Sequence, residues 1–164
     1  MLASKQILRV DMSLTATAFD VDTAARLRAA IGSVQRRLRS TQAAAAAGLT
    51  PTKISILFTV ARSGPIGLSG LAEAEAINPT MLSRVVAGLA EKGLVKRISD
   101  PADRRAAQLE ATPAGRRLAD RIRRERTDAL NDALAPLDPR DREALEHALP
   151  ALEALAEQLK RQRS

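Results

Sequence analysis

Cysteine and aromatic residues are scarce in this sequence. It contains no cysteine, tryptophan or tyrosine, and its only aromatic residues are Phe19 and Phe58. Without cysteine the chain can form neither a disulfide framework nor a thiolate zinc site, and it cannot sense oxidants through a thiol. We therefore expect a protein of the reducing cytoplasm. A ligand pocket lined with aromatic rings is not expected.

Long apolar runs are also missing. No stretch approaches the roughly 20 residues that a helix needs to span a bilayer, and no apolar run follows Lys5 and Arg9 to form a secretory signal. The arginine-rich helix after Pro113 lacks the Trp and Phe anchors of an interfacial helix. We expect a soluble, cytoplasmic protein with no membrane partner.

The residue groups that usually carry catalysis are absent as well. The single histidine, His147, lies among charged neighbours near the end of the chain and is interpreted as solvated or dimer-facing. We find no glycine-rich phosphate loop, no metal-ligand cluster and no nucleophile paired with a base. The sequence therefore predicts that the protein is not an enzyme and uses no metal or other cofactor.

Positive charge is abundant. The 26 Lys and Arg residues outnumber the 19 Asp and Glu residues, which gives a formal net charge of +7. Such an excess favours polyanionic partners, above all nucleic acid, and the arginine fork suits both phosphate and guanine. An alanine- and arginine-rich genome composition would produce the same excess, so charge alone leaves both explanations open.

Helix starts are marked by four dipeptides. In each, a side chain able to accept a hydrogen bond from an orphan backbone N–H precedes a proline, which is well tolerated at the first helical position. The four dipeptides are Thr50-Pro51, Asn78-Pro79, Thr112-Pro113 and Asp138-Pro139. A fifth, short helix is expected after Ser69.

Apolar periodicity completes the order of elements. One long helix is expected over residues 22–47, ended by Gly48, and the helix from Pro79 is expected to end at Gly93 in a left-handed conformation. Residues 94–111 alternate around the turn sequence Asp100 to Asp103, which predicts a β-hairpin. The order is therefore four helices, a hairpin and two helices.

The fold class that follows is mainly α with a small β-hairpin wing, as a winged helix-turn-helix lobe plus a helical dimerisation stem. We divide the chain into a loose N-terminal arm (residues 1–20), a dimerisation helix (21–49), a winged helix-turn-helix DNA-binding lobe (50–112) and C-terminal dimerisation helices (113–164). The stem carries apolar stripes that one small lobe could not cover, so a second copy is the expected partner. The predicted dimerisation residues are Leu27, Ile31, Leu145, Leu149, Leu152 and Leu159.

The helix from Pro79 is the predicted recognition helix, because it follows a short helix and a tight turn and precedes a basic hairpin. Its predicted DNA-binding residues are Asn78, Thr80, Met81, Ser83 and Arg84. Hydroxyls can bond to phosphate or bases, arginine can fork onto guanine, and methionine can contact a thymine methyl. Taken alone, these residues also fit a solvated helix face.

The hairpin carries a second basic cluster, and its predicted DNA-binding residues are Lys96, Arg97, Asp103, Arg104 and Arg105. Crowded arginines at a slim tip suit the negative potential of a minor groove, and Asp103 could hold one of them in position. The alternative is an edge strand kept charged against aggregation.

Two segments resemble the MarR-type regulators: GLVKRISDPADRRAAQLEATPAG resembles their wing, and LAEAEAINPTMLSRVVAGLAEKGLV resembles their helix-turn-recognition helix. The resemblance implies a homodimer on double-stranded DNA, often an autorepressor, with Arg105 at the minor groove. It also implies release by a small, often aromatic, anionic effector in a cleft between the dimer helices and the lobe. The rival function is a winged helix used for protein or RNA contact, although RNA binders usually carry stacking aromatics.

Two departures from the family pattern bear on structure. Glu75-Ala76 stands where the family usually has an apolar residue and a glycine, so the turn before the recognition helix must be formed differently or shifted. Ala111-Thr112 replaces the usual Leu-Thr but keeps the capping hydroxyl.

Overall fold

The computed structural model describes residues 20–99 and 107–162. The chain divides into two units, residues 1–36 and 37–164, and each is described by itself. The described part is mainly helical with a small antiparallel sheet, so the predicted fold class is confirmed. The predicted N-terminal arm lies almost entirely outside the described residues. Within the described ranges, no helix combines the length and apolarity needed to cross a membrane.

The predicted single helix over residues 22–47 is wrong, because the structure has α1 (Val21–Leu38) and a separate α2 (Gln42–Ala46). Thr41 is extended, and its hydroxyl accepts a hydrogen bond from the Ala44 N–H, which starts the new helix. Both oxygens of Glu125 accept from the Ala43 N–H at 3.2 and 3.0 Å. These caps satisfy the first amides of α2 while Ala43 and Ala44 pack with the buried Ile122. Gly48, which was expected to end the helix, follows α2 in a left-handed conformation, and so does Gly93 after α5, as predicted.

All four dipeptides that were expected to start helices do so. They begin α3 (Pro51–Ser63), α5 (Pro79–Glu91), α6 (Pro113–Leu134) and α7 (Pro139–Arg161). The side chains of Thr50, Asn78 and Thr112 accept the expected backbone hydrogen bonds, and Asp138 accepts from the Arg140 N–H at 2.8 Å. The short helix α4 (Leu68–Glu75) lies between α3 and α5.

The predicted hairpin is present as β2 (Val95–Ser99) and β3 (Ala107–Ala111), which pair antiparallel with Lys96 opposite Glu110. The structure adds a strand that the sequence analysis missed, β1 (Ile66–Gly67), which pairs with β3 on its other side. The sheet order is β1-β3-β2. A two-residue strand has no periodicity to detect, which is why it escaped prediction.

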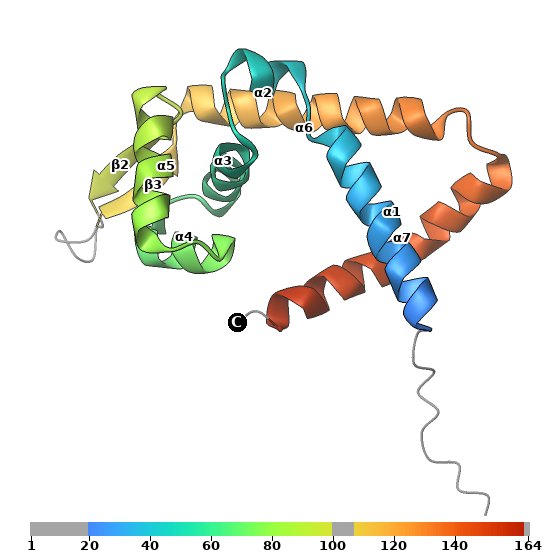
Figure 1. Cartoon of the computed structure of the whole chain (residues 1–164). Helices are drawn as coiled ribbons and strands as arrows, with labels where there is room; N and C mark the ends of the chain where they lie inside the picture. Colours follow the sequence, from blue (N-terminus) through green and yellow to red (C-terminus); the bar gives the residue numbers. More distant parts are fainter. Residues whose placement is uncertain (1–19, 100–106, 163–164) are drawn as a thin grey trace, which may run out of the picture. The chain divides into compact units, whose positions relative to one another are not determined.

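One core holds the lobe together. It lies between α3, α4, α5 and the sheet, and α2 and α3 lie against α6 (Figure 1). Its largest fully buried side chains are Ile56, Leu57, Leu71, Leu82, Leu89, Leu109, Val60 and Val86. Ile122 belongs to a second buried cluster, with Ala43, Ala44 and Ile54. In α6 the buried residues Gly115, Ala119 and Ile122 recur at helical spacing. The core therefore fixes α5 and the sheet on one rigid support.

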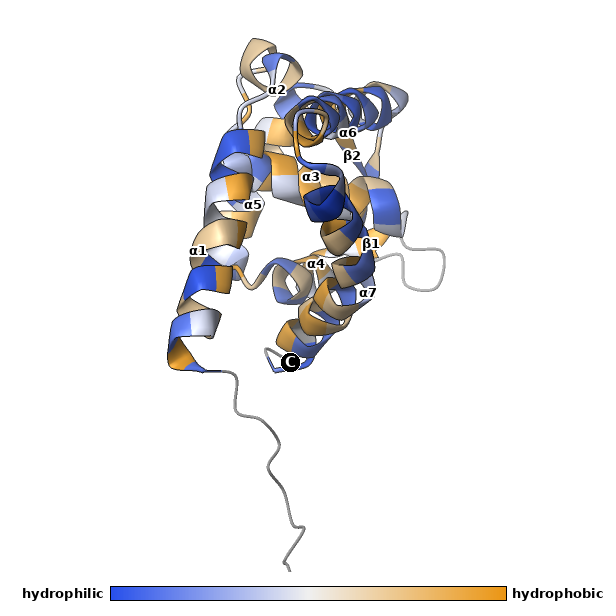
Figure 2. Ribbon diagram, turned by 90° about the vertical axis from the view of Figure 1, so that its right-hand side faces the viewer, coloured by the Kyte–Doolittle hydropathy of each residue, from blue (hydrophilic) through white to orange (hydrophobic). Residues whose placement is uncertain are grey.

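The helix α7 differs from the helices of the lobe because none of its described side chains is buried. Apolar residues recur along it between charged ones (Figure 2). Leu149 and Leu159 are each 53% exposed. In the other unit, α1 also has no buried residue.

Candidate nucleic-acid interface

The turn between α4 and α5 is built on a left-handed alanine. Ala76 has φ 51°, ψ 44°, and is the only non-glycine residue with positive φ in the described chain. Its N–H donates to the Glu73 carbonyl, and the Ile77 N–H donates to the Ala72 carbonyl. The turn therefore forms at the position where the family usually has a glycine, and Ala76 carries the backbone strain that a glycine would avoid.

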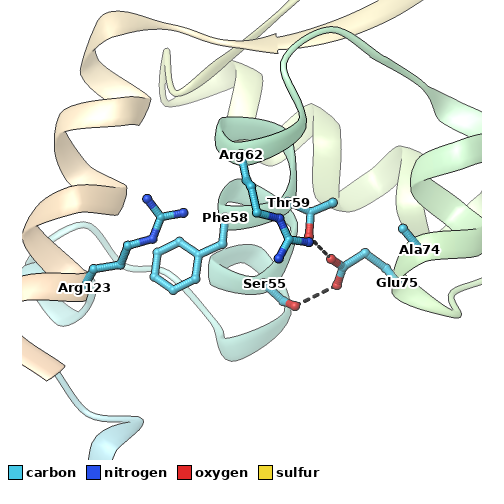
Figure 3. A pocket seen from close by; sticks show the side chains of 7 residues that line it. All are labelled: Ser55, Phe58, Thr59, Arg62, Ala74, Glu75 and Arg123. Atoms are coloured by element: carbon cyan, nitrogen blue, oxygen red, sulfur yellow. Dashed lines mark hydrogen bonds between the residues drawn. The ribbon is translucent and has the colours of Figure 1, made fainter. Parts of the chain in front are cut away.

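Glu75 holds this turn to α3. Its carboxylate accepts hydrogen bonds from the Ser55 hydroxyl at 2.7 Å and from the Thr59 hydroxyl (Figure 3). Thr59 is buried, whereas Ser55 is exposed. The acidic residue that departs from the family pattern thus has a structural role, because two hydroxyls of α3 hold its carboxylate. The sequence contained this signal only as hydroxyls four residues apart.

The predicted recognition helix, α5, buries one face and exposes the other. Leu82, Val86 and Leu89 are in the core, while the predicted DNA-binding residues Thr80, Met81, Ser83 and Arg84 are all exposed. Arg84 forms no ion pair with any residue in the described ranges. The side chains that a groove would meet are therefore exposed together on one helix, and no carboxylate of the described chain binds the guanidinium of Arg84.

Asn78 has a different place from the other predicted recognition residues. Its side-chain oxygen accepts a hydrogen bond from the Met81 N–H at 2.8 Å and caps α5. This bond orients the start of the helix. The NH₂ group of the side chain is not used by it and could donate to a ligand.

In the predicted wing, Lys96 and Arg97 are exposed on β2. Lys96 is not a free cation, because its Nζ lies 3.0 Å from Glu110 Oε2. The other Glu110 oxygen lies 3.1 Å from Nη2 of Arg116. Hydrogen bonds from Lys96 and then from Arg116 lower the pKa of Glu110 below its ordinary value. The sequence analysis missed this bridge, because the turn that it predicted, Asp100 to Asp103, does not give the register that pairs Lys96 with Glu110.

Arg97 has no ion-pair partner among residues 20–99 and 107–162. The other predicted wing residues, Asp103, Arg104 and Arg105, lie outside the described residues.

A cleft of about 770 Å³ lies beside the α4–α5 turn, and its lining residues are Ser55, Phe58, Thr59, Arg62, Ala74, Glu75 and Arg123 (Figure 3). The lining is mostly polar, and Phe58 is its single aromatic residue. The guanidinium of Arg123 lies 4.9 Å from the centre of the Phe58 ring and that of Arg126 lies 5.3 Å from it. Burial lowers the pKa of Arg126. In the described part of the chain no group of His, Asp or Glu side chains is arranged to hold a metal ion.

The predicted dimerisation residues fall on the two poorly buried helices. On α1, Leu27 is half-buried and Ile31 is exposed; on α7, Leu152 is half-buried, and Leu145, Leu149 and Leu159 are exposed. His147 is exposed on α7, with Nδ1 2.8 Å from the Glu143 carbonyl oxygen. The structure therefore leaves four of the six predicted dimerisation residues exposed.

Comparison with known proteins places this arrangement among DNA-binding regulators. A model of the MarR family matches residues 49–107. An uncharacterized HTH-type transcriptional regulator of Mycobacterium bovis is 30% identical over 139 residues, which is 85% of this chain and 96% of that protein.

Solved structures of regulators have a similar fold. A putative transcriptional regulator from Pseudomonas aeruginosa is similar with a TM-score of 0.72 and 30% identity, over 85% of this chain and 96% of that one. Streptococcus pneumoniae FabT, solved in complex with DNA, has the same fold with a TM-score of 0.66 and 14% identity, over 83% of this chain and 99% of that one.

Proposed function

This chain belongs to the MarR family of transcriptional regulators and is a DNA-binding protein, not an enzyme, and we propose that it acts as a homodimeric repressor on a near-palindromic operator. The observation that carries the proposal is the exposed face of α5. Its hydroxyls and its unpaired Arg84 stand opposite a fully buried apolar face, as base reading in a major groove requires. A DNA-binding regulator acts where the genome is, so we place it in the cytoplasm.

We attribute to each part of the surface a separate task. Thr80, Ser83 and Arg84 would contact bases and neighbouring phosphates in the major groove, with Met81 against thymine methyls. Arg97 and the wing tip, with Asp103, Arg104 and Arg105, would lie at the adjacent minor groove. Asn78 supports this by fixing the start of α5.

The dimer is supported by the apolar side chains that α1 and α7 leave exposed. On α7 these are Leu145, Leu149, Leu155 and Leu159, with exposures from 38% to 53%. Four such leucines on one helix are a large apolar surface for a chain with a well-buried core elsewhere. A second copy of the chain would cover them and would present two α5 helices to two half-sites.

The effector that the family resemblance implies would occupy the cleft beside Glu75. Support comes from its place, because its lining includes the carboxylate that holds the α4–α5 turn to α3. A ligand there would act on the turn that sets the angle of α5. Both nearby guanidinium groups lie against Phe58, so an aromatic ring would have to compete with them for that ring's faces.

The test is fluorescence anisotropy of the full chain with labelled duplexes tiled across the DNA upstream of its own gene, over a series of salt concentrations. We expect nanomolar binding to one near-palindromic tile, a steep salt dependence, and loss of tile preference in Arg84→Ala and Arg105→Ala. Sedimentation at micromolar concentration should give the mass of a dimer. Weak binding to every tile, equal in both variants, or a monomeric mass would overturn the proposal.

A further inference from the structure

Lys53 lies in the first turn of α3, but its side chain ends on α5. A methyl group placed on Gly88 of α5 would lie 3.0 Å from the Lys53 Nζ and 3.3 Å from its Cε. These distances are tighter than most real Cβ contacts, so an alanine at position 88 would make the end of the lysine shift by a few tenths of an ångström. The ammonium of Lys53 therefore rests against the backbone of the recognition helix.

The place on α5 where the ammonium rests is the side that carries Arg84. Gly88 follows Arg84 by four residues, which puts the two positions on the same face one turn apart. Ser83 and Ala87 are exposed beside them. A lysine of α3 thus adds a positive charge to the exposed face of a different helix.

The positive charge of Lys53 is not neutralised by any carboxylate in the described chain. The first turn of α3 contains no acidic residue, and no carboxylate in residues 20–99 or 107–162 forms an ion pair with Lys53. A helix N-terminus carries partial positive charge, so a lysine in the first turn is repelled by its own helix. The partial positive charge at the start of α3 also attracts anions, and the Lys53 ammonium adds to that attraction.

We propose that Lys53 binds a backbone phosphate of the operator at the edge of the groove that α5 enters, and that Gly88 leaves room for the lysine to lie there. The inference rests on the proposed DNA contact of α5. Lysine serves as a compact point charge for phosphate. Such a contact fixes the position of the lobe on the duplex but carries no base preference.

The experiment measures the affinity of the full chain for its operator and for an unrelated duplex, from 0.1 to 0.5 M salt, for Lys53→Met and Gly88→Ala. Each phosphate contact contributes about 0.9 to the slope of log K against log salt. A dimer that loses both lysine contacts should therefore show a slope about 2 units shallower. Its affinity at 0.1 M salt should fall on the order of tenfold or more, for both duplexes alike.

Gly88→Ala should shift the end of the lysine and reduce affinity less than Lys53→Met does, and it should have no further effect in the Lys53→Met background. Lys53→Arg should restore the wild-type slope, because it keeps the charge. Arg117→Gln is the control: it removes the same charge from an exposed position of a different helix, α6, where the arginine forms no ion pair with any residue in the described ranges, and it should leave the slope unchanged.

The outcomes separate this inference from the proposed function. If Arg84→Ala abolishes operator preference while Lys53→Met keeps the wild-type slope and affinity, the phosphate contact of Lys53 is wrong and the role of α5 stands. If Arg84→Ala changes nothing, the role of α5 itself is wrong. If Gly88→Ala and Lys53→Met reduce affinity additively, Gly88 is not the seat of the lysine.

Discussion

Replacement of Gly115 by alanine is expected to destabilise the protein, although alanine is the better helix former. Gly115 is buried in the first turn of α6, where a Cβ would overlap the backbone carbonyl of Leu94 and would lie 3.3 Å from Leu57 Cδ1. The Leu94 carbonyl cannot turn away, because it accepts a hydrogen bond from the Thr112 N–H at 3.0 Å. An alanine must therefore push α6 away from the segment that leads into β2.

The magnitude follows from three opposing contributions. Overpacking against backbone costs about 1–3 kcal/mol, and weakening the bond between Thr112 and Leu94 costs about 0.5–1.5 kcal/mol. The higher helix propensity of alanine returns about 1 kcal/mol. The free energy of unfolding of Gly115→Ala should therefore fall by about 0.5–3.5 kcal/mol.

Urea denaturation at one fixed protein concentration measures this change, since a dimer's stability depends on concentration. Gly70→Ala is the matched control: it lies in the first turn of α4, and its methyl group would meet only Ile66 side-chain atoms at 3.8 and 4.0 Å. This variant should gain about 0.5–1 kcal/mol. A midpoint for Gly115→Ala at or above that of the wild type would refute the reasoning.

Three further predictions concern the turn, the wing and the stem. Ala76→Gly should raise the free energy of unfolding by about 1 kcal/mol, because glycine adopts the observed positive φ without strain, and urea denaturation measures this gain. The lowered pKa of Glu110 means that its ion pairs stabilise the fold above its ordinary pKa of 4.5 and are lost as the pH falls below that value. Urea midpoints from pH 7 to pH 3 should show this loss in the wild type, and a steeper fall in Glu110→Gln would contradict it. Leu149→Asp should shift the sedimentation equilibrium toward monomer, and an unchanged dimer would place the interface elsewhere.

Helix starts were predictable because their signal is local. A capping side chain followed by proline needs no tertiary partner, and each of the four such dipeptides begins a helix. The break between α1 and α2 was not predictable in the same way. The alanine run after Thr41 is a good helix former in either arrangement, and what favours a new helix is Glu125, a residue far away in the sequence.

The candidate interface shows the same division. The exposed face of α5 followed from periodicity alone, because its opposite face is apolar at helical spacing. The use of Glu75 as a link to α3 did not, since a carboxylate beside a turn reads as solvent-exposed until the hydroxyls of Ser55 and Thr59 are found within reach. The contact between Lys53 and Gly88 was equally hidden, because it joins two helices whose crossing no local pattern specifies.

Net charge is a poor measure of what this chain offers to DNA, because some of its cations are already engaged within the fold. Glu110 binds Lys96 and Arg116, and Phe58 lies under two more guanidinium groups. In the described ranges, the lobe cations without a carboxylate partner include Lys53, Arg84 and Arg97. Two of them meet on the exposed face of α5, and the third lies on β2, which leads to the wing tip. These three free charges lie where the proposed grooves would be, so the position of the charge, and not its total, carries the functional argument.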